Sequence, residues 1–197
     1  MYDPPDFREE RPEVLHGVIR AQPLETSRLR LVAATIAHLD AELAGGGGLA
    51  TLLGARIPSG WPPGLHDAEA VRFFRARLLA DGAAAAGWYA WYAIAHSEGG
   101  APATLIGSGG YMGPPAPDGT VEIGYSVVES ERRRGYASEM VGALVARALA
   151  QPGVTRVVAE ARTDNAPSQG VLVRCDFRLE GPGRDADHGR WRYAPQA

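Results

Sequence analysis

The sequence contains no lysine: all 20 basic residues among its 197 are arginine. The absence of lysine excludes Schiff-base catalysis by a side-chain amine, and it excludes self-acetylation at such an amine. A single cysteine, Cys175, excludes an internal disulfide framework and fits a reducing compartment. The arginine excess, with 25 Gly and 15 Pro, is also what a GC-rich coding bias produces. Arginine content alone therefore indicates no ligand.

Long apolar runs and a broad positive face are missing too. The net charge of -3 argues against a nucleic-acid partner, because acids offset the basic residues. No apolar segment approaches the roughly 20 residues of a membrane span. Acids and prolines occupy the first positions, where a signal peptide needs basic and then apolar residues. We expect a cytoplasmic protein that binds neither nucleic acid nor membrane.

Length and composition, with 45% hydrophobic and 22% charged residues, fit a single globular domain. Residues 1–22 are polar, contain proline and lack periodicity, which predicts a flexible arm before a domain spanning 23–197. Alternation and 3.6-residue periodicity predict the elements. The expected strands are 27–33, 88–96, 103–113, 120–128, 154–161, 177–180 and 190–193, and the expected helices are 35–44, 67–80, 134–150 and 165–175. The glycines and prolines of 45–66 predict a hinge and loop without long regular structure. This order indicates a mixed α/β fold.

Three adjacent arginines, Arg132–Arg134, stand directly before Gly135 and an amphipathic helix. Like charges in a row need either open water or an anion. The first amides of a helix have no internal partner and lie at the positive end of its dipole. Gly135 lets a bulky anion approach the backbone, and Ser138 adds a hydroxyl. The segment therefore favours a phosphate or pyrophosphate site, and the alternative at this point is a charged loop that caps the helix.

The segment RRRGYA, residues 132–137, resembles the R/Q-x-x-G-x-G/A signature of GNAT-type N-acetyltransferases. The wider VEIGYSVVESERRRGYASEMVGALVARAL is similar to their RimJ/RimL branch, and the likeness runs from about residue 24 to 193. Two positions depart from the pattern, because relatives often carry glycine where Arg133 and Asp176 stand. Aspartate tolerates the left-handed conformation at a helix C-terminus at modest cost.

The resemblance implies a single-domain GNAT fold, with a mixed, mostly antiparallel central sheet, two splayed parallel strands and flanking helices. Acetyl-CoA, the implied acyl donor, would lie between strands 120–128 and 154–161, and no metal is implied. Pantetheine would pair with the backbone of Ser126, Val127 and Val128. The pyrophosphate would be held by Arg132, Arg133, Arg134, Gly135, Tyr136, Ala137 and Ser138. Asn165 and Ser168 would contact the pantetheine and its thiol end, and Asn165 could equally cap the following helix.

The implied reaction is direct acetyl transfer to a primary amine in a ternary complex, without an acyl-enzyme. The acceptor stays open between a protein N-terminal α-amine and a small-molecule amine. An amine with a pKa near 10 needs a base or water chain, and Glu122 is the best candidate, with a salt-bridged carboxylate as the alternative. Relatives in other branches use a tyrosine where Leu172 stands, so Ser168, Tyr136 or water must protonate the thiolate.

Two other functions fit the same residues: a non-catalytic acyl-CoA-binding sensor or interaction module on this fold, and a nucleotide-phosphate domain of another family. The five histidines show no metal-ligand spacing. Trp61 in the segment SGWPPG either lines an acceptor pocket or packs in the core. The sequence leaves the oligomeric state open, a homodimer included.

Overall fold

Eight strands form one sheet in the computed structural model, which describes residues 21–45, 47–64 and 66–195. Their order across the sheet is β1-β2-β3-β4-β5-β6-β8-β7. The parallel pair is β5 and β6, and the other neighbours are antiparallel. The strands are β1 Leu24–Glu25, β2 Leu29–Ala33, β3 Ala90–Ala95, β4 Thr104–Tyr111, β5 Thr120–Val127, β6 Arg156–Arg162, β7 Phe177–Pro182 and β8 His188–Tyr193.

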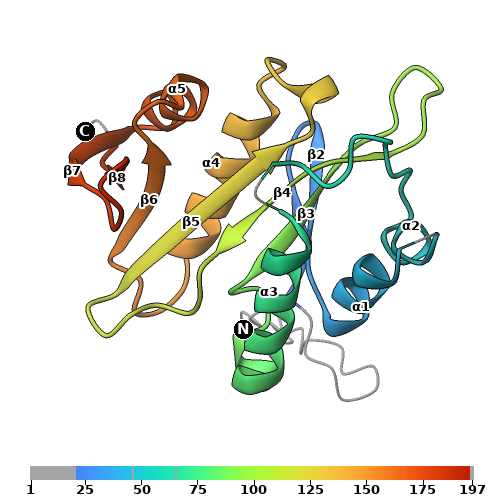
Figure 1. Ribbon diagram of the computed structural model, residues 1–197, viewed down its shortest axis with the longest axis horizontal. Helices are drawn as coiled ribbons and strands as arrows, with labels where there is room; N and C mark the ends of the chain where they lie inside the picture. The colour runs from blue at the N-terminus through green and yellow to red at the C-terminus, as the bar shows by residue number, and fades with distance from the viewer. Residues whose placement is uncertain (1–20, 46, 65, 196–197) are drawn as a thin grey trace, which may run out of the picture.

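Helices cover both faces of the sheet (Figure 1). On one face, α1 (Ile36–Ala44), α2 (Gly48–Leu53) and α3 (Ala68–Asp81) pack over the half formed by β2, β3 and β4. On the other face, α4 (Tyr136–Leu149) crosses the centre, and α5 (Ala166–Arg174) packs beside it. Among the described residues, no helix has the length and apolar character required to cross a membrane.

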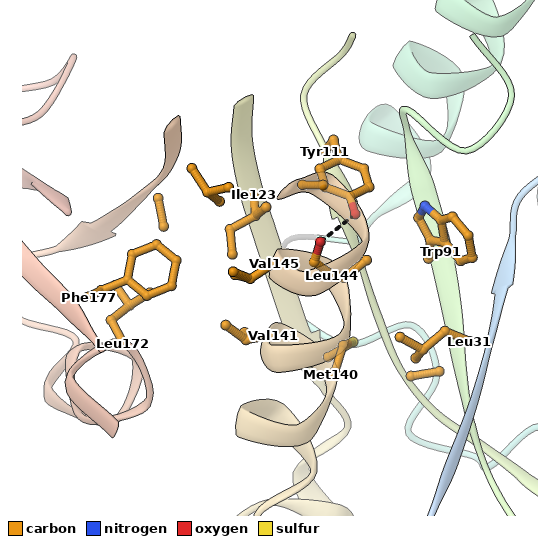
Figure 2. Packing of buried hydrophobic residues seen from close by; sticks show 14 of the residues in the cluster. Leu31, Trp91, Tyr111, Ile123, Met140, Val141, Leu144, Val145, Leu172 and Phe177 are labelled. Carbon is orange, nitrogen blue, oxygen red and sulfur yellow. Dashed lines mark hydrogen bonds between the residues drawn. The ribbon is translucent and has the colours of Figure 1, made fainter. Parts of the chain in front are cut away.

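The larger core lies between α4 and the sheet (Figure 2). Alternate residues of β5, Val121 and Ile123, are buried toward α4, where Met140 and Leu144 lie on the apolar stripe of the helix. The hydroxyl of Tyr111 donates to the Leu144 carbonyl at 2.7 Å, which fixes β4 against the helix. The opposite side of β5 is therefore free of this core.

The two parallel strands pair over only half their length. Thr120–Ile123 of β5 is in register with 156–159 of β6, whereas Gly124–Val127 of β5 pairs with β4 alone. Figure 1 shows the two strands diverging toward their carboxyl ends. We call the space beyond Ile123 and Ala159 the β5–β6 split. It confirms the splayed parallel strands that the family resemblance implied.

The order of the larger elements and the meander β3-β4-β5 confirm the sequence prediction, with shifts of at most two residues at the boundaries. One α-helix and one strand were missed. Helix α2 begins at Gly48, inside the predicted glycine hinge, because Leu49 and Leu53 bury themselves in the smaller core. Strand β1 is two residues long and follows Pro23, so no alternation could reveal it. Residues 1–20 of the predicted arm lie outside the described residues.

Candidate active site

The N-terminus of α4 lies at the open end of the split. Gly135 is its N-cap, with a φ of 83°, and no side chain among the described residues hydrogen-bonds to the first amides of the helix. A left-handed φ favours glycine because a Cβ would crowd the following carbonyl. These amides, at the positive end of the helix dipole, are therefore available to an anion.

The three arginines before this helix have different surroundings. The Arg132 Nε donates to the Val127 carbonyl at 3.1 Å. Arg134 pairs with the Glu131 carboxylate and lies 5.3 Å from the centroid of the Tyr136 ring. Arg133 has a φ of 61° and an exposed side chain, and no partner for its guanidinium is found in the described part of the chain. Of the three, Arg133 is thus the arginine whose entire guanidinium is without a partner among the described residues.

The hydrogen bonds that β5 already makes reduce the number of backbone groups that could pair with pantetheine. The Glu122 carbonyl accepts from Met112 N, and Val128 N donates to the Ile106 carbonyl, so even-numbered residues face β4. Tyr125 and Val127 then direct their backbone groups into the split. The backbone of Ser126 and Val128 belongs to the β4 side, and the Val127 carbonyl is taken by Arg132. Of Ser126–Val128, this leaves the Val127 amide for strand-like pairing with a ligand.

The hydroxyls of Tyr125 on β5 and Ser168 on α5 lie close together across the β5–β6 split. The Tyr125 hydroxyl lies 2.9 Å from the Ser168 carbonyl and 3.0 Å from Ser168 Oγ. Burial raises the pKa of Tyr125 to about 12, so its hydroxyl stays protonated at neutral pH. Asn165 accepts from Ser168 N at 3.1 Å, which confirms its capping role. The contact of Tyr125 with Ser168 was not predicted, because alternation placed the Tyr125 side chain with the core.

Glu122 faces the side of β5 away from α4, and its carboxylate is engaged. Arg184, on the connection between β7 and β8, donates to it at 2.8 Å, and the Glu122 side chain is 19% exposed. The salt-bridged alternative therefore describes its resting contacts. Its role as a base stays a prediction.

A buried polar cluster lies on that same face, under the loop before α3. The Glu42 carboxylate of α1 accepts from Trp61 Nε1 at 2.7 Å and from the Tyr92 hydroxyl at 2.6 Å. His66 Nε2 lies 3.2 Å from both carboxylate oxygens, and His66 Nδ1 lies 3.0 Å from Ser108 Oγ of β4. Burial acts to raise the pKa of Glu42, but the hydrogen bonds and charge of His66, with those of Tyr92 and Trp61, lower it overall. Burial and the nearby carboxylate raise the pKa of Tyr92.

This cluster borders a pocket of about 330 Å³ between α1, α3 and the loop 57–67. Trp61 packs against the smaller core, which confirms one interpretation of this residue, and it also lines the pocket. That the pocket takes the acceptor stays a prediction. Glu42, His66 and Ser108 come from three separate segments. No local motif could have predicted their meeting.

A second cavity, about 510 Å³, runs along the exposed side of α4. Ser138 and Gly135 line it together with Arg174 and Cys175 from the end of α5. The Ser138 hydroxyl lies 3.5 Å from Arg174 Nη1, so its nearest partner is α5. Burial raises the pKa of the Cys175 thiol, and Tyr136 is buried between Arg28 and Arg134. Within the described residues, no group of three His, Cys, Asp or Glu is arranged to hold a metal ion.

An uncapped helix N-terminus beside a splayed pair of parallel strands is the arrangement that the sequence resemblance implied. The model of the acetyltransferase (GNAT) domain family matches residues 28–178. The chain belongs to the GNAT acetyltransferase family. It is 31% identical over 170 residues to YjdG of Bacillus subtilis (strain 168), an uncharacterised N-acetyltransferase, covering 86% of this chain and 96% of YjdG.

Solved GNAT structures share the fold at lower identity. RimL, a ribosomal L7/L12 α-N-protein acetyltransferase, superposes with a TM-score of 0.56 at 19% identity, over 87% of this chain and 93% of RimL. The microcin C7 self-immunity acetyltransferase MccE, solved in complex with acetyl-CoA and AMP, superposes with a TM-score of 0.57 at 12% identity. That superposition covers 85% of this chain and 92% of MccE.

Proposed function

We propose that this GNAT protein is an N-acetyltransferase of the RimJ/RimL branch, which transfers the acetyl group of acetyl-CoA to a primary amine by direct attack. One observation carries the proposal: the uncapped amides of α4 and the free edge of β5 meet at the same end of the β5–β6 split. An acyl donor in which an extended amide chain is joined to an anionic pyrophosphate needs both features together.

The residues present fit acetyl-CoA. The amides after Gly135 and the open guanidinium of Arg133 would hold the pyrophosphate, and the Val127 amide would pair with the pantetheine chain. When bound, the thioester supplies an activated acetyl carbon. Ser168, whose hydroxyl lies 3.0 Å from that of Tyr125 across the split, would orient the thiol end.

The acceptor amine belongs on the face of β5 that Glu122 and Ser126 share. The 330 Å³ pocket, which Trp61 and Glu42 line, lies on the same face of the sheet. The shared fold and the branch signature of the sequence favour an N-terminal α-amine as acceptor, with a small-molecule amine as the alternative. No nucleophilic side chain is needed, because the amine attacks the thioester itself.

The test is a calorimetric titration with acetyl-CoA, with desulfo-CoA and ATP as controls, followed by thiol release on an amine panel. The panel contains a polyamine, an arylethylamine and tetrapeptides that begin with Ser or Ala. We expect binding of acetyl-CoA over ATP and turnover of at least one amine. Binding with no turnover would establish the non-catalytic acyl-CoA module instead. Competition by ATP would support a nucleotide site and contradict the proposal.

A further inference from the structure

Three buried side chains on the face of the sheet opposite α4 form a continuous hydrogen-bonded chain that ends on β4, next to β5. They are Glu42 of α1, His66 of the loop before α3 and Ser108 of β4, which we call the relay. The side chains of Glu42 and His66 are 9% and 4% exposed, and Ser108 is 5% exposed. Such burial keeps the chain in one arrangement, because each polar group would lose its partner if it moved.

The contacts of Glu42 determine which nitrogen of His66 carries the hydrogen. A carboxylate only accepts hydrogen bonds, so Nε2, at 3.2 Å from both oxygens, is the protonated nitrogen. Nδ1 is then left with a lone pair, and it accepts from the Ser108 hydroxyl at 3.0 Å. The imidazole is thus held with Nδ1, its basic nitrogen, toward Ser108 of the sheet. The Glu42 carboxylate on the other side of the ring would stabilise the imidazolium.

The relay ends on β4, beside β5. Ser108 is directly opposite Ser126 in the β4–β5 register, and opposite residues of an antiparallel pair have their Cβ atoms about 5 Å apart on one face. The loop closes over this point, because a Cβ on Gly64 would lie 2.8 Å from Ser126 Oγ. Ser126 is half-buried and belongs to the strand whose far edge is the β5–β6 split.

We infer that His66, held by Glu42 and linked through Ser108 and Ser126, is the base that accepts the proton of the acceptor amine. This inference rests on the proposed function. The transfer forms a bond between the amine nitrogen and the acetyl carbon and breaks the carbon–sulfur bond. The proton leaves nitrogen along the serine hydroxyls to Nδ1, and the thiolate keeps the electron pair of the broken bond and takes a proton from water. Glu122, already paired with Arg184, is not needed as the base.

The groups facing His66 support this role. Glu42 from α1 and Tyr92 from β3 are the titratable neighbours within hydrogen-bond or ring contact, and Trp61 covers the ring at a centroid distance of 5.4 Å. Asp67, next in the chain, turns away to cap α3. Among the described residues, the carboxylate that stabilises a proton taken up by His66 is thus that of Glu42.

The decisive variant is His66→Gln, because a glutamine amide can donate to Glu42 and accept from Ser108 but cannot take a proton. The experiment measures kcat and kcat/KM against pH 5.5–9 with acetyl-CoA and the best amine of the panel. We expect kcat to fall roughly 100-fold or more and the acidic limb of the profile to disappear, with the Kd for acetyl-CoA unchanged. Ser108→Ala should lower kcat by about tenfold or more with the limb kept, and Ser108→Thr should restore most of it.

His96→Gln, at an exposed histidine outside the relay, and Glu122→Gln serve as controls that should keep the acidic limb. A His66→Gln protein that keeps its limb and loses less than threefold in kcat overturns the inference, even if its melting temperature falls. Loss of the limb in Glu122→Gln also overturns it. The proposed function is judged on the wild-type protein alone: no acetyl-CoA binding, or no turnover, contradicts that function and the inference with it.

Discussion

At the scale of single residues, two glycines of the same helix have opposite roles. Gly135 has a φ of 83°, and a Cβ there would lie 3.2 Å from Arg28 Nη2. Gly142 lies in the middle of α4 with nothing within 4 Å of an added Cβ. The first glycine is required by the backbone, whereas the second only adds freedom to the unfolded chain.

We predict that Gly135→Val destabilises the fold by about 1–2 kcal/mol and weakens acetyl-CoA binding at least about tenfold, because the amide cradle must shift. Gly142→Ala should instead stabilise it by about 0.5–1 kcal/mol, since alanine is the better helix former. Urea unfolding and calorimetry on both variants check this pair. Equal effects of the two substitutions would show that the left-handed cap is not what Gly135 provides.

Residues whose role is local could be predicted from the sequence. Asn165 caps its helix as expected, and Asp176 takes the left-handed φ of 61° that its place before Phe177 suggested. Residues whose role depends on a distant partner could not. The pairing of Glu122 with Arg184 spans 62 positions, and that of His66 with Ser108 spans 42.

At the scale of elements, Glu139 ties α4 to the turn before β2. Its carboxylate accepts from the Thr26 hydroxyl at 2.6 Å, from Arg28 N at 2.8 Å and from Arg28 Nε at 2.7 Å. Burial acts to raise the pKa of Glu139, but the hydrogen bonds from Thr26, Arg28 and Ser27 outweigh it and lower that pKa below its ordinary 4.5. Glu139 thereby anchors α4, whose N-terminus forms the candidate anion site, to the turn between β1 and β2.

Glu139→Gln should lower the free energy of unfolding by about 1–2 kcal/mol at pH 7, with screening by solvent at the half-exposed Arg28 included. Because the folded pKa is depressed, the contribution is full above pH 4.5 and is lost as pH falls through the lower folded value. The difference between wild type and variant should therefore shrink below pH 4.5 in urea titrations. Glu98→Gln, at an exposed turn, should change stability by less than about 0.5 kcal/mol, and an equal loss there would contradict the anchoring role.

Periodicity predicted the elements that bury one regular face. Helix α4 carries its apolar residues at helical spacing, and β5 alternates cleanly, so both were found with boundaries close to the structure. Helix α2 escaped because its six residues offer less than two turns of pattern and begin in glycine. The glycines and prolines of 45–66 indicated a flexible backbone. They did not reveal that burial of Leu49 and Leu53 in the smaller core stabilises a helix there.

At the scale of the whole molecule, the sheet is two halves joined by four paired residues. Strands β1–β5 form one half and β6–β8 the other, and β5 contacts β6 in register only from Thr120 to Ile123. Helices α4 and α5 pack under both halves, and the Tyr125–Ser168 pair bridges the open end. A ligand that fills the split adds contacts to both halves at once, so its binding should stabilise the complete fold.

We predict that acetyl-CoA at 100 times its Kd raises stability by about 2.7 kcal/mol, which for a chain of this size shifts the melting temperature by about 5–10 °C. Scanning calorimetry with acetyl-CoA, and with ATP at the same concentration, measures the shift. The Gly135→Val variant should lose most of this shift at the same ligand concentration, because weaker binding adds less to the stability of the folded state. If Gly135→Val keeps the full wild-type shift in melting temperature, the ligand binds away from the N-terminus of α4. A substitution at Gly135 can reduce the shift only if the ligand binds the amides that follow this glycine.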